Sequence, residues 1–284
     1  MRVLVTGGAG FIGSNLLKEL RTNHVYNGME LYSIDNYFTG TEDNHIKGVT
    51  YYNDKTWSIN DYEPFDIVFH FGEYSRVVPS FKDIKKCFLY NLYGTTTIIE
   101  YCKKHNAKLI YSASSSKFGD NENLSPYSWV KSKMVELIKN YGEWFDLNYQ
   151  ICYFYNVYGE NQICKGDYAT VIGKFEEQYK NGKPLTIYGT GNQTRQFTYI
   201  KDLVDGILKA MEQDKSSEWY LSSEQEYTIN EVASLFDYAI KYVEQPRGER
   251  TQAVLPKNNH KEILNWEIKH TLEDWIKRIT SGQK

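Results

Sequence analysis

The sequence contains few cysteines and no long apolar run. Its four cysteines are Cys87, Cys102, Cys152 and Cys164. They form no C-x-x-C pair and accompany no histidine cluster at metal-ligand spacing, so we expect no metal site and a reducing, cytoplasmic compartment. No stretch approaches about 18 apolar residues, and Met1 leads directly into a strand-like segment rather than the apolar core of a signal peptide. The sequence thus predicts a chain that neither spans a membrane nor is exported.

The sequence also lacks an excess of charge of either sign. It has 33 Lys and Arg against 36 Asp and Glu, for a formal net charge of -3, with 41% hydrophobic and 24% charged residues. These totals are typical of globular proteins and favour neither disorder nor a basic surface that binds nucleic acid. A length of 284 residues is enough for one large core with an additional lobe.

Short apolar segments alternate with longer helical patterns in the first half of the chain. We predict strands at 2–6, 30–34, 67–71, 108–114 and 149–155, and helices at 11–21, 80–104 and 127–145. This alternation is typical of parallel strands joined by crossover helices that cover both faces of a sheet. The sequence therefore predicts an α/β fold with a doubly wound parallel Rossmann sheet in a domain of residues 1–155.

The second half, residues 156–284, is less regular. Turn signals interrupt it at Asn181-Gly182, Gly189-Thr190-Gly191 and Pro246-Arg247-Gly248. We expect a smaller α/β lobe there, with some segments returning to the Rossmann domain. Such a lobe would close a cleft over the carboxyl ends of the parallel strands.

A glycine-rich turn joins the first predicted strand to the first predicted helix. Gly7 permits the tight turn, Gly10 lets the backbone approach a pyrophosphate, and Gly13 lets the helix lie close to the strand. The second strand leads to Asp35, about 20 residues further on, where a carboxylate would accept hydrogen bonds from an adenosine ribose and repel a 2′-phosphate. The pattern predicts binding of NAD(H) in preference to NADP(H).

A tyrosine and a lysine lie about one helical turn apart at the start of the predicted helix 127–145. Tyr127 and Lys131 share one helix face, and a strand that ends in serines precedes them. Lowering a tyrosine pKa from about 10 to near 7 requires roughly 4 kcal/mol, which a neighbouring ammonium and a positively charged nicotinamide could largely supply. We expect Tyr127 to act as a general base, with a serine hydroxyl bonded to the reacting oxygen.

Together these motifs resemble the extended short-chain dehydrogenases/reductases of the nucleotide-sugar epimerase/dehydratase family, and most of all its UDP-glucose 4-epimerase branch. The resemblance covers nearly the whole chain, including Thr6 to Gly13, the serine run, the Tyr127/Lys131 pair and residues 187–202. It implies that Ser114 is the catalytic serine and that Lys131 lowers the pKa of Tyr127. It also implies NAD as cofactor and a nucleotide-diphosphate sugar as substrate.

The resemblance assigns further residues to the two ligands. Those implied for the cofactor are Gly7, Gly10, Phe11, Ile12, Gly13, Asp35, Asn36, Asp54, Phe71, Gly72, Asn91, Tyr127 and Lys131. Those implied for the sugar diphosphate are Asn156, Arg195 and Arg247, and Ser115 and Ser116 are also expected to bind the substrate. A homodimer is implied as well, because relatives pair the helices that match residues 80–104 and 127–145. The apolar positions expected at that interface include Val130, Met134, Leu137, Tyr141 and Trp144.

Two segments depart from the family pattern. At the positions where 4,6-dehydratases of the family carry Thr-Asp-Glu, this chain has Ser114, Ser115 and Ser116. Because the elimination of water needs an acid and a base, dehydration is disfavoured, and chemistry limited to transfer of a hydride and a hydroxyl proton is favoured. After the predicted strand 67–71, many relatives have small apolar residues where this chain has Glu73 to Arg76. Glu73 and Arg76 either contact the substrate, act as an auxiliary acid or base, or pair with each other on one helical turn.

The leading functional prediction is an NAD-dependent nucleotide-sugar 4-epimerase. Tyr127 would take the proton of the sugar 4-hydroxyl as hydride leaves carbon 4, and the 4-keto sugar would turn over before hydride returns to its other face. An NAD(P)H-dependent 4-keto-sugar-nucleotide reductase is the alternative within the family. A noncatalytic NAD-binding scaffold or redox sensor is the alternative of another class, and the complete Ser114, Tyr127 and Lys131 set argues against it.

Overall fold

A seven-stranded sheet forms the centre of the protein. The computed structural model describes residues 1–118, 123–248, 250–252, 254–258 and 260–282. The strands of the sheet are β1 (Arg2–Thr6), β2 (Glu30–Asp35), β3 (Val49–Asn53), β4 (Ile67–His70), β5 (Lys108–Ser114), β6 (Tyr149–Phe154) and β11 (Ser217–Leu221). Their order is β11-β6-β5-β4-β1-β2-β3, and every neighbouring pair is parallel. The predicted doubly wound Rossmann sheet is confirmed.

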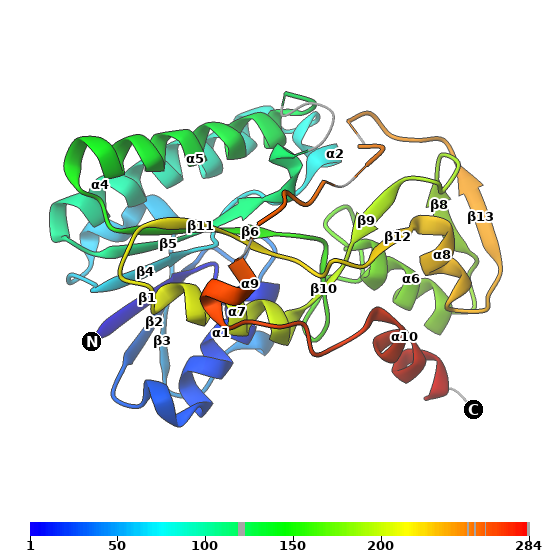
Figure 1. Ribbon diagram of the computed structural model, residues 1–284, viewed down its shortest axis with the longest axis horizontal. Coiled ribbons are helices and arrows are strands. Elements are labelled where there is room, and N and C mark those ends of the chain that lie inside the picture. Colours follow the sequence, from blue (N-terminus) through cyan, green and yellow to red (C-terminus); the bar gives the residue numbers. More distant parts are fainter. Residues whose placement is uncertain (119–122, 249, 253, 259, 283–284) are drawn as a thin grey trace.

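Helices cover both faces of this sheet (Figure 1). On one face lie α1 (Phe11–Thr22) and α7 (Ile200–Met211), and on the other lie α4 (Thr95–His105) and α5 (Pro126–Phe145). Alternate residues of β1 point to the two faces, because Val3 and Val5 belong to the core beneath α1 and α7 while Leu4 belongs to the core beneath α4 and α5. A strand that is apolar on both faces is thereby fully buried.

The helix that carries the predicted tyrosine begins at a well-defined cap. The hydroxyl oxygen of Ser125 accepts a hydrogen bond of 3.0 Å from the backbone N–H of Ser128, and Pro126 fills the first helical position. The helix ends at Asp146, which has a left-handed conformation with φ 56°. Tyr127 is therefore fixed in the first turn, at the carboxyl end of the sheet.

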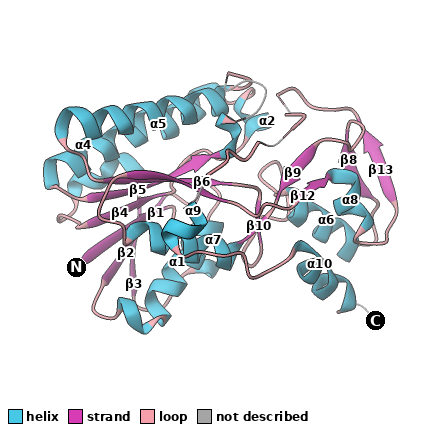
Figure 2. Cartoon of the chain, viewed as in Figure 1, coloured by secondary structure: helices cyan, strands magenta, loops and turns pink. Residues whose placement is uncertain are grey.

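The second half of the chain builds a smaller lobe, on the right of Figure 2. Its helices are α6 (Val171–Lys180), α8 (Ile229–Ser234) and α10 (Leu272–Ser281). Its strands form three pairs: β7 (Val157–Tyr158) with β10 (Thr198–Tyr199), β8 (Leu185–Tyr188) with β13 (Ile240–Val243), and β9 (Thr194–Gln196) with β12 (Glu226–Thr228). We propose that the boundary between the Rossmann domain and the smaller lobe lies between residues 155 and 156. Three segments of the second half return to the Rossmann domain: α7, β11 and α9 (His260–Leu264).

The structure corrects one predicted helix and adds two strands that the sequence analysis missed. The predicted helix 80–104 is interrupted, because α2 (Val77–Ser80) stops before Asp83, whose φ of -130° and ψ of 51° lie outside the helical region. The chain then continues through α3 (Ile84–Phe88) and a π-helical stretch (Leu89–Gly94) into α4. The sequence analysis also missed β3, a half-buried edge strand, and β11, which comes from the second half. Among the described residues, no helix has the length and apolar character needed to cross a membrane.

Candidate active site

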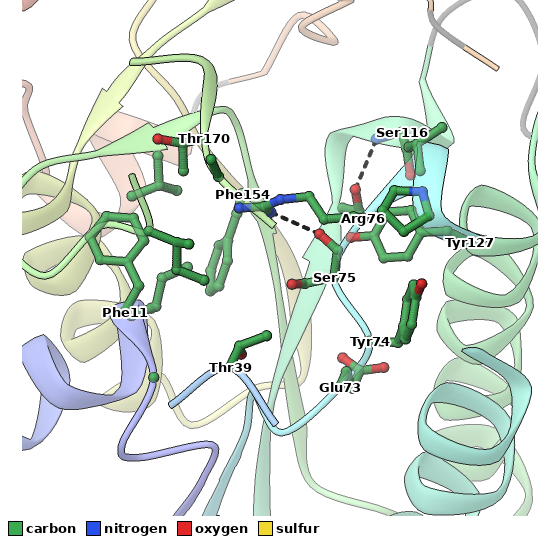
Figure 3. Close-up of a pocket in the computed structure, with 18 of the residues that line it drawn as sticks. Phe11, Thr39, Glu73, Tyr74, Ser75, Arg76, Ser116, Tyr127, Phe154 and Thr170 are labelled. Carbon is green, nitrogen blue, oxygen red and sulfur yellow. Dashed lines mark hydrogen bonds between the residues drawn. The ribbon is translucent and has the colours of Figure 1, made fainter. Parts of the chain in front are cut away.

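A cleft of about 590 Å³ lies over the carboxyl ends of the strands, between the sheet and the smaller lobe (Figure 3). Most of the residues assigned from the sequence line it. They are Gly7, Gly10, Phe11, Ile12, Gly13, Asp35, Asn36, Phe71, Gly72, Glu73, Arg76, Ser114, Ser115, Ser116, Tyr127, Lys131, Asn156 and Arg195. The strand order reverses between β1 and β4, which is where doubly wound sheets form their ligand crevice.

The glycine turn has the shape that a pyrophosphate needs. Gly7 has a left-handed φ of 74°, and a Cβ there would lie 2.9 Å from the backbone nitrogen of Gly72. A Cβ on Gly10 would meet only the Gly7 oxygen, at 3.2 Å, so the turn is open on that side. The first turn of α1 has no side-chain cap at Gly10, which leaves its N–H donors for a ligand. These features fit the diphosphate of NAD.

Asp35 forms the wall of the cleft at the end of β2. Its carboxylate accepts hydrogen bonds from the backbone N–H groups of Ala9, at 2.9 Å, and Tyr37, at 2.8 Å. Burial raises the pKa of Asp35, and the two backbone donors oppose that shift. The carboxylate is therefore held in one position, where a ribose hydroxyl would meet an acceptor and a 2′-phosphate would meet a negative charge.

Ser114 and Tyr127 meet at the junction of β5 and α5. The Ser114 hydroxyl accepts a hydrogen bond of 3.1 Å from the Ser116 backbone N–H (Figure 3), and both Ser114 and Tyr127 line the cleft. Burial raises the pKa of Tyr127 to about 12, the Glu73 carboxylate adds to the rise, and the bond to Ser114 and the charge of Arg76 oppose it. The protein's own groups therefore raise the pKa of this phenol, so the lowering expected from the sequence is not supplied by the protein alone.

Lys131 is not a free ammonium beside Tyr127. Its Nζ forms a buried ion pair with Glu73 and also donates a hydrogen bond to the carbonyl of Ser112. The Lys131 and Glu73 side chains are only 5% and 4% exposed. Burial lowers the pKa of Lys131, and Glu73 opposes that shift. The role of Lys131 toward Tyr127 stays a prediction, and the structure adds that its ammonium is paired with Glu73.

A network of hydroxyl groups surrounds Glu73. The carboxylate accepts hydrogen bonds from Thr95 and Tyr111, both at 3.1 Å, and from Ser112 at 3.2 Å. Behind it, the ring of His70 bridges Thr95, at 3.0 Å, and Thr6, at 2.8 Å. Burial lowers the pKa of His70 to about 4, so the ring is neutral near pH 7. His70 thus has a supporting role within this network.

Arg76 does not pair with Glu73, so that alternative is wrong. The two residues do not share a helical turn, because Glu73 lies in a bend and Arg76 has extended backbone, with φ -144° and ψ 141°. The guanidinium donates to the carbonyl of Tyr168 from Nε, at 2.9 Å, and from Nη2, at 2.6 Å, and to the carbonyl of Ser75 from Nη1, at 2.8 Å. Burial lowers the pKa of Arg76, and Tyr127 and Tyr168 oppose that shift.

Three assigned residues are not among those that line the cleft. The carboxylate of Asp54 accepts hydrogen bonds from Ser58, at 2.8 Å, and Tyr62, at 3.0 Å. The amide of Asn91 pairs with both backbone groups of Tyr74, at 2.7 and 2.8 Å, and so holds the segment after β4. The guanidinium of Arg247 lies 5.0 Å from the centre of the Phe81 ring, lining a separate recess. Their ligand roles stay predictions.

Arg250 is a cleft residue that the sequence analysis missed. Its Nη1 donates hydrogen bonds to the carbonyls of Ser115 and Phe118, and its own carbonyl accepts one of 2.9 Å from Arg195. Asn156, on the same side of the cleft, donates to the carbonyl of Gln196 at 2.8 Å. In the sequence, the only feature that could have pointed to Arg250 is its position three residues after Arg247. The smaller lobe therefore brings two guanidinium groups to the cleft.

Comparison with known proteins identifies the family. The model of the NAD dependent epimerase/dehydratase family matches residues 3–221. The chain belongs to this family. It is an NAD-dependent enzyme of the extended short-chain dehydrogenase/reductase type, as the resemblance in the sequence indicated, and NAD is its cofactor.

Similar proteins span the length of the chain. UDP-glucuronic acid decarboxylase 6 of Arabidopsis thaliana is 29% identical, over 97% of this chain and 87% of the relative. UDP-glucuronic acid decarboxylase 1 of Danio rerio is 26% identical, over 98% of this chain and 71% of the relative. A crystal structure of UDP-glucose 4-epimerase with UDP-glucose, from Thermotoga maritima, is 26% identical, with a TM-score of 0.89, and the match covers 99% of this chain and 98% of that one.

The position of Asp35 predicts the choice of cofactor. We expect NADH to bind more tightly than NADPH by about tenfold or more, or about 1.4 kcal/mol, because the carboxylate repels a 2′-phosphate. Calorimetric titration would measure both affinities. Replacing Asp35 with serine should reduce the difference between the affinities for NADH and NADPH, while the same change at the exposed Asp61 should leave that difference unchanged. Tighter binding of NADPH by the unaltered protein would contradict this assignment.

Proposed function

We propose that the protein is an NAD-dependent nucleotide-sugar 4-epimerase that acts by transient oxidation at sugar carbon 4. The observation that carries the proposal is that Ser114, at the end of β5, and Tyr127, in the first turn of α5, line the same cleft at the junction of its two halves. On one side lies the glycine turn that fits NAD, and on the other lie Asn156 and Arg195 of the smaller lobe. A sugar between them would present its hydroxyl group to both side chains.

The residues at this junction divide the chemistry between them. NAD, when bound, supplies the acceptor and donor of hydride at carbon 4. Tyr127 takes the proton of the 4-hydroxyl and later returns it, and Ser114 holds that oxygen within hydrogen-bond reach. The adjoining Ser115 and Ser116 are buried hydroxyl residues, so the end of β5 offers no carboxyl group for elimination of water. This set of groups favours reversible oxidation of a hydroxyl.

The basic groups of the smaller lobe favour a diphosphate substrate. Arg195 and Arg250 carry guanidinium groups, which bind phosphate oxygens through paired N–H donors. Asn156 adds an amide close to them. The names of similar proteins support the same substrate class, since the Thermotoga maritima structure contains UDP-glucose and the plant relative is named for UDP-glucuronic acid.

Replacement of Tyr127 with phenylalanine tests the assigned base. We expect turnover to fall by about a hundredfold or more, which is the usual contribution of a positioned general base, while NAD binding changes little. Turnover would be followed by NMR of the sugar, and NAD binding by calorimetry. Tyr238→Phe, which alters an exposed phenol of the smaller lobe, is the matched control and should retain full turnover. Full activity of the Tyr127 variant would remove this residue from the mechanism.

The proposal is distinguished from a 4-keto-sugar-nucleotide reductase by the fate of the cofactor. A 4-epimerase ends each cycle with its cofactor in the starting oxidation state, whereas a reductase consumes one NADH for each sugar. We expect catalytic amounts of enzyme to form 4-epimers from UDP-, GDP- or dTDP-sugars without added reductant, as observed by NMR. Absence of any epimer, together with stoichiometric oxidation of NADH by a 4-keto sugar nucleotide, would assign the reductase activity instead.

We also propose that the protein is a homodimer. Val130 and Met134, expected at the interface, are buried in the subunit's own core. Large apolar side chains are nevertheless exposed along α3, the π-helical stretch and the end of α5. They are Ile84, Leu89, Leu92, Tyr93, Trp144 and Phe145, with exposed fractions between 37% and 59%. Such a set of exposed apolar side chains on these three segments favours association of two copies.

Light scattering at micromolar concentration measures the oligomeric state. We expect the mass of two chains, and we expect Leu92→Glu combined with Trp144→Glu to yield the mass of one, since both changes bury charge at the proposed interface. Val25→Glu changes an equally apolar and more exposed side chain at a distance from these helices and should leave the dimer intact. A monomeric mass for the unaltered protein would contradict the proposal.

A further inference from the structure

A short segment of the smaller lobe, residues 163–170, contacts the Rossmann domain across the cleft. It lies just before α6, and we call it the strap. Its residues, all of them described, lie outside helices and strands. The backbone N–H of Thr170 donates a hydrogen bond of 3.0 Å to the carbonyl of Ile163, and that of Ala169 donates one of 3.2 Å to Gly166. The strap is thus one compact turn, closed at its base.

The guanidinium of Arg76 holds the strap from the segment after β4. Its Nε and Nη2 both donate to the carbonyl of Tyr168, at 2.9 and 2.6 Å, while its Nη1 donates to the carbonyl of Ser75 at 2.8 Å. Because the donor is charged, these hydrogen bonds are stronger than those between neutral groups. Figure 3 shows the side chain of Arg76 extended across the cleft, toward the side on which Thr170 lies. Arg76 therefore joins the two halves of the cleft.

The ring of Tyr168 packs against two aromatic side chains of the Rossmann domain. Its centre lies 5.2 Å from that of Phe38, with the ring planes at 80°, and 5.6 Å from that of Tyr74, with the planes at 75°. Such edge-to-face contacts are a favoured arrangement of aromatic rings. Tyr74 is only 1% exposed, so its ring is a fixed support for the strap. The strap is thus held against two separate segments, one after β2 and one after β4.

These two segments flank the site expected for the cofactor. Phe38 lies three residues after Asp35, and Tyr74 lies two residues after Gly72, against which the glycine turn packs. The strap itself lines the same cleft as the glycine turn, for example through Thr170. The contacts of Tyr168 therefore close the cleft beside the place where a dinucleotide would bind.

We propose that the strap retains the cofactor, with Arg76 and Tyr168 fastening it across the cleft, so that NAD(H) leaves only when these contacts open. Arg76 acts through the strap and is a positioning residue. The inference goes beyond the proposed 4-epimerase reaction, because it concerns the exchange of cofactor rather than chemistry at the sugar. Retention suits an enzyme that ends each cycle with its cofactor in the starting oxidation state.

The rate at which NADH leaves the protein tests this proposal. Protein loaded with NADH is mixed rapidly with an excess of NAD, and the fluorescence of bound NADH is followed with no sugar present. Arg76→Met removes the hydrogen bonds to the strap and keeps the apolar stem, so the dissociation rate should rise by about tenfold or more. Arg21→Met makes the same change at an exposed arginine of α1 and should leave the rate unchanged.

Tyr168→Ala tests the aromatic contacts of the strap. It keeps the carbonyl that Arg76 contacts but removes the ring from Phe38 and Tyr74, so the dissociation rate should again rise by about tenfold. Because both changes release the same strap, the double variant should dissociate about as fast as the faster single variant. Tyr242→Ala, at an exposed tyrosine of β13, is the control and should leave the rate unchanged.

Two results would overturn the proposal. One is an unchanged dissociation rate in either single variant. The other is a double variant whose rate rises by the product of the two single effects, because that result indicates a direct contact of Arg76 with the cofactor, independent of the strap. If Arg76→Met does not fold, as judged by its thermal transition, Tyr168→Ala decides alone. The assay contains no sugar, so a failure of the 4-epimerase proposal would appear separately, as an absence of epimers with the dissociation rates altered as expected.

Discussion

The close packing of two glycines, where β1 and β4 end, sets the geometry of the whole cleft. A Cβ on Gly7 would lie 2.9 Å from the backbone nitrogen of Gly72, so neither strand end tolerates a side chain at this crossing. The hydroxyl of Thr6 accepts hydrogen bonds from the N–H groups of Phe71, at 3.1 Å, and Gly72, at 2.9 Å. The cofactor turn and the segment that carries Glu73 are thereby fixed relative to each other.

A chain of hydrogen bonds extends this constraint to the catalytic groups. It runs from Thr6 through His70 and Thr95 to Glu73, and from there to Lys131. Removing a charged pair from water costs several kcal/mol per ion, and only close contact with further hydrogen bonds offsets that cost. The hydroxyl groups around Glu73 meet this requirement. Because of the desolvation cost, the ion pair of Glu73 and Lys131 adds little to the stability of the fold. This is consistent with an electrostatic role beside Tyr127.

The sugar side of the cleft depends on segments that are distant in the sequence. Arg250 reaches the turn after β5 through the carbonyls of Ser115 and Phe118, and it also accepts a hydrogen bond from Arg195. Asn156, with a left-handed φ of 32°, contacts the carbonyl of Gln196. Three separate stretches of the second half therefore line this side of the cleft. The groups that would bind a diphosphate are positioned by these contacts rather than by any local motif.

Local sequence was enough to predict five of the seven strands of the Rossmann sheet, the glycine turn, and the positions of Asp35 and Tyr127, because each depends on strand and helix periodicity or on residues within one turn. Ser114 was assigned through the resemblance to the family. Local sequence did not determine the partner of Lys131. Glu73 and Arg76 are three residues apart and suggested a pair, but the segment between them is not helical, and their contacts lie 58 and 92 positions away, at Lys131 and Tyr168. The sequence analysis expected Arg247 in the cleft, but the folded chain places Arg250 there, again through contacts with residues distant in the sequence. Pairing between charges depends on distance in space, which only the folded chain fixes.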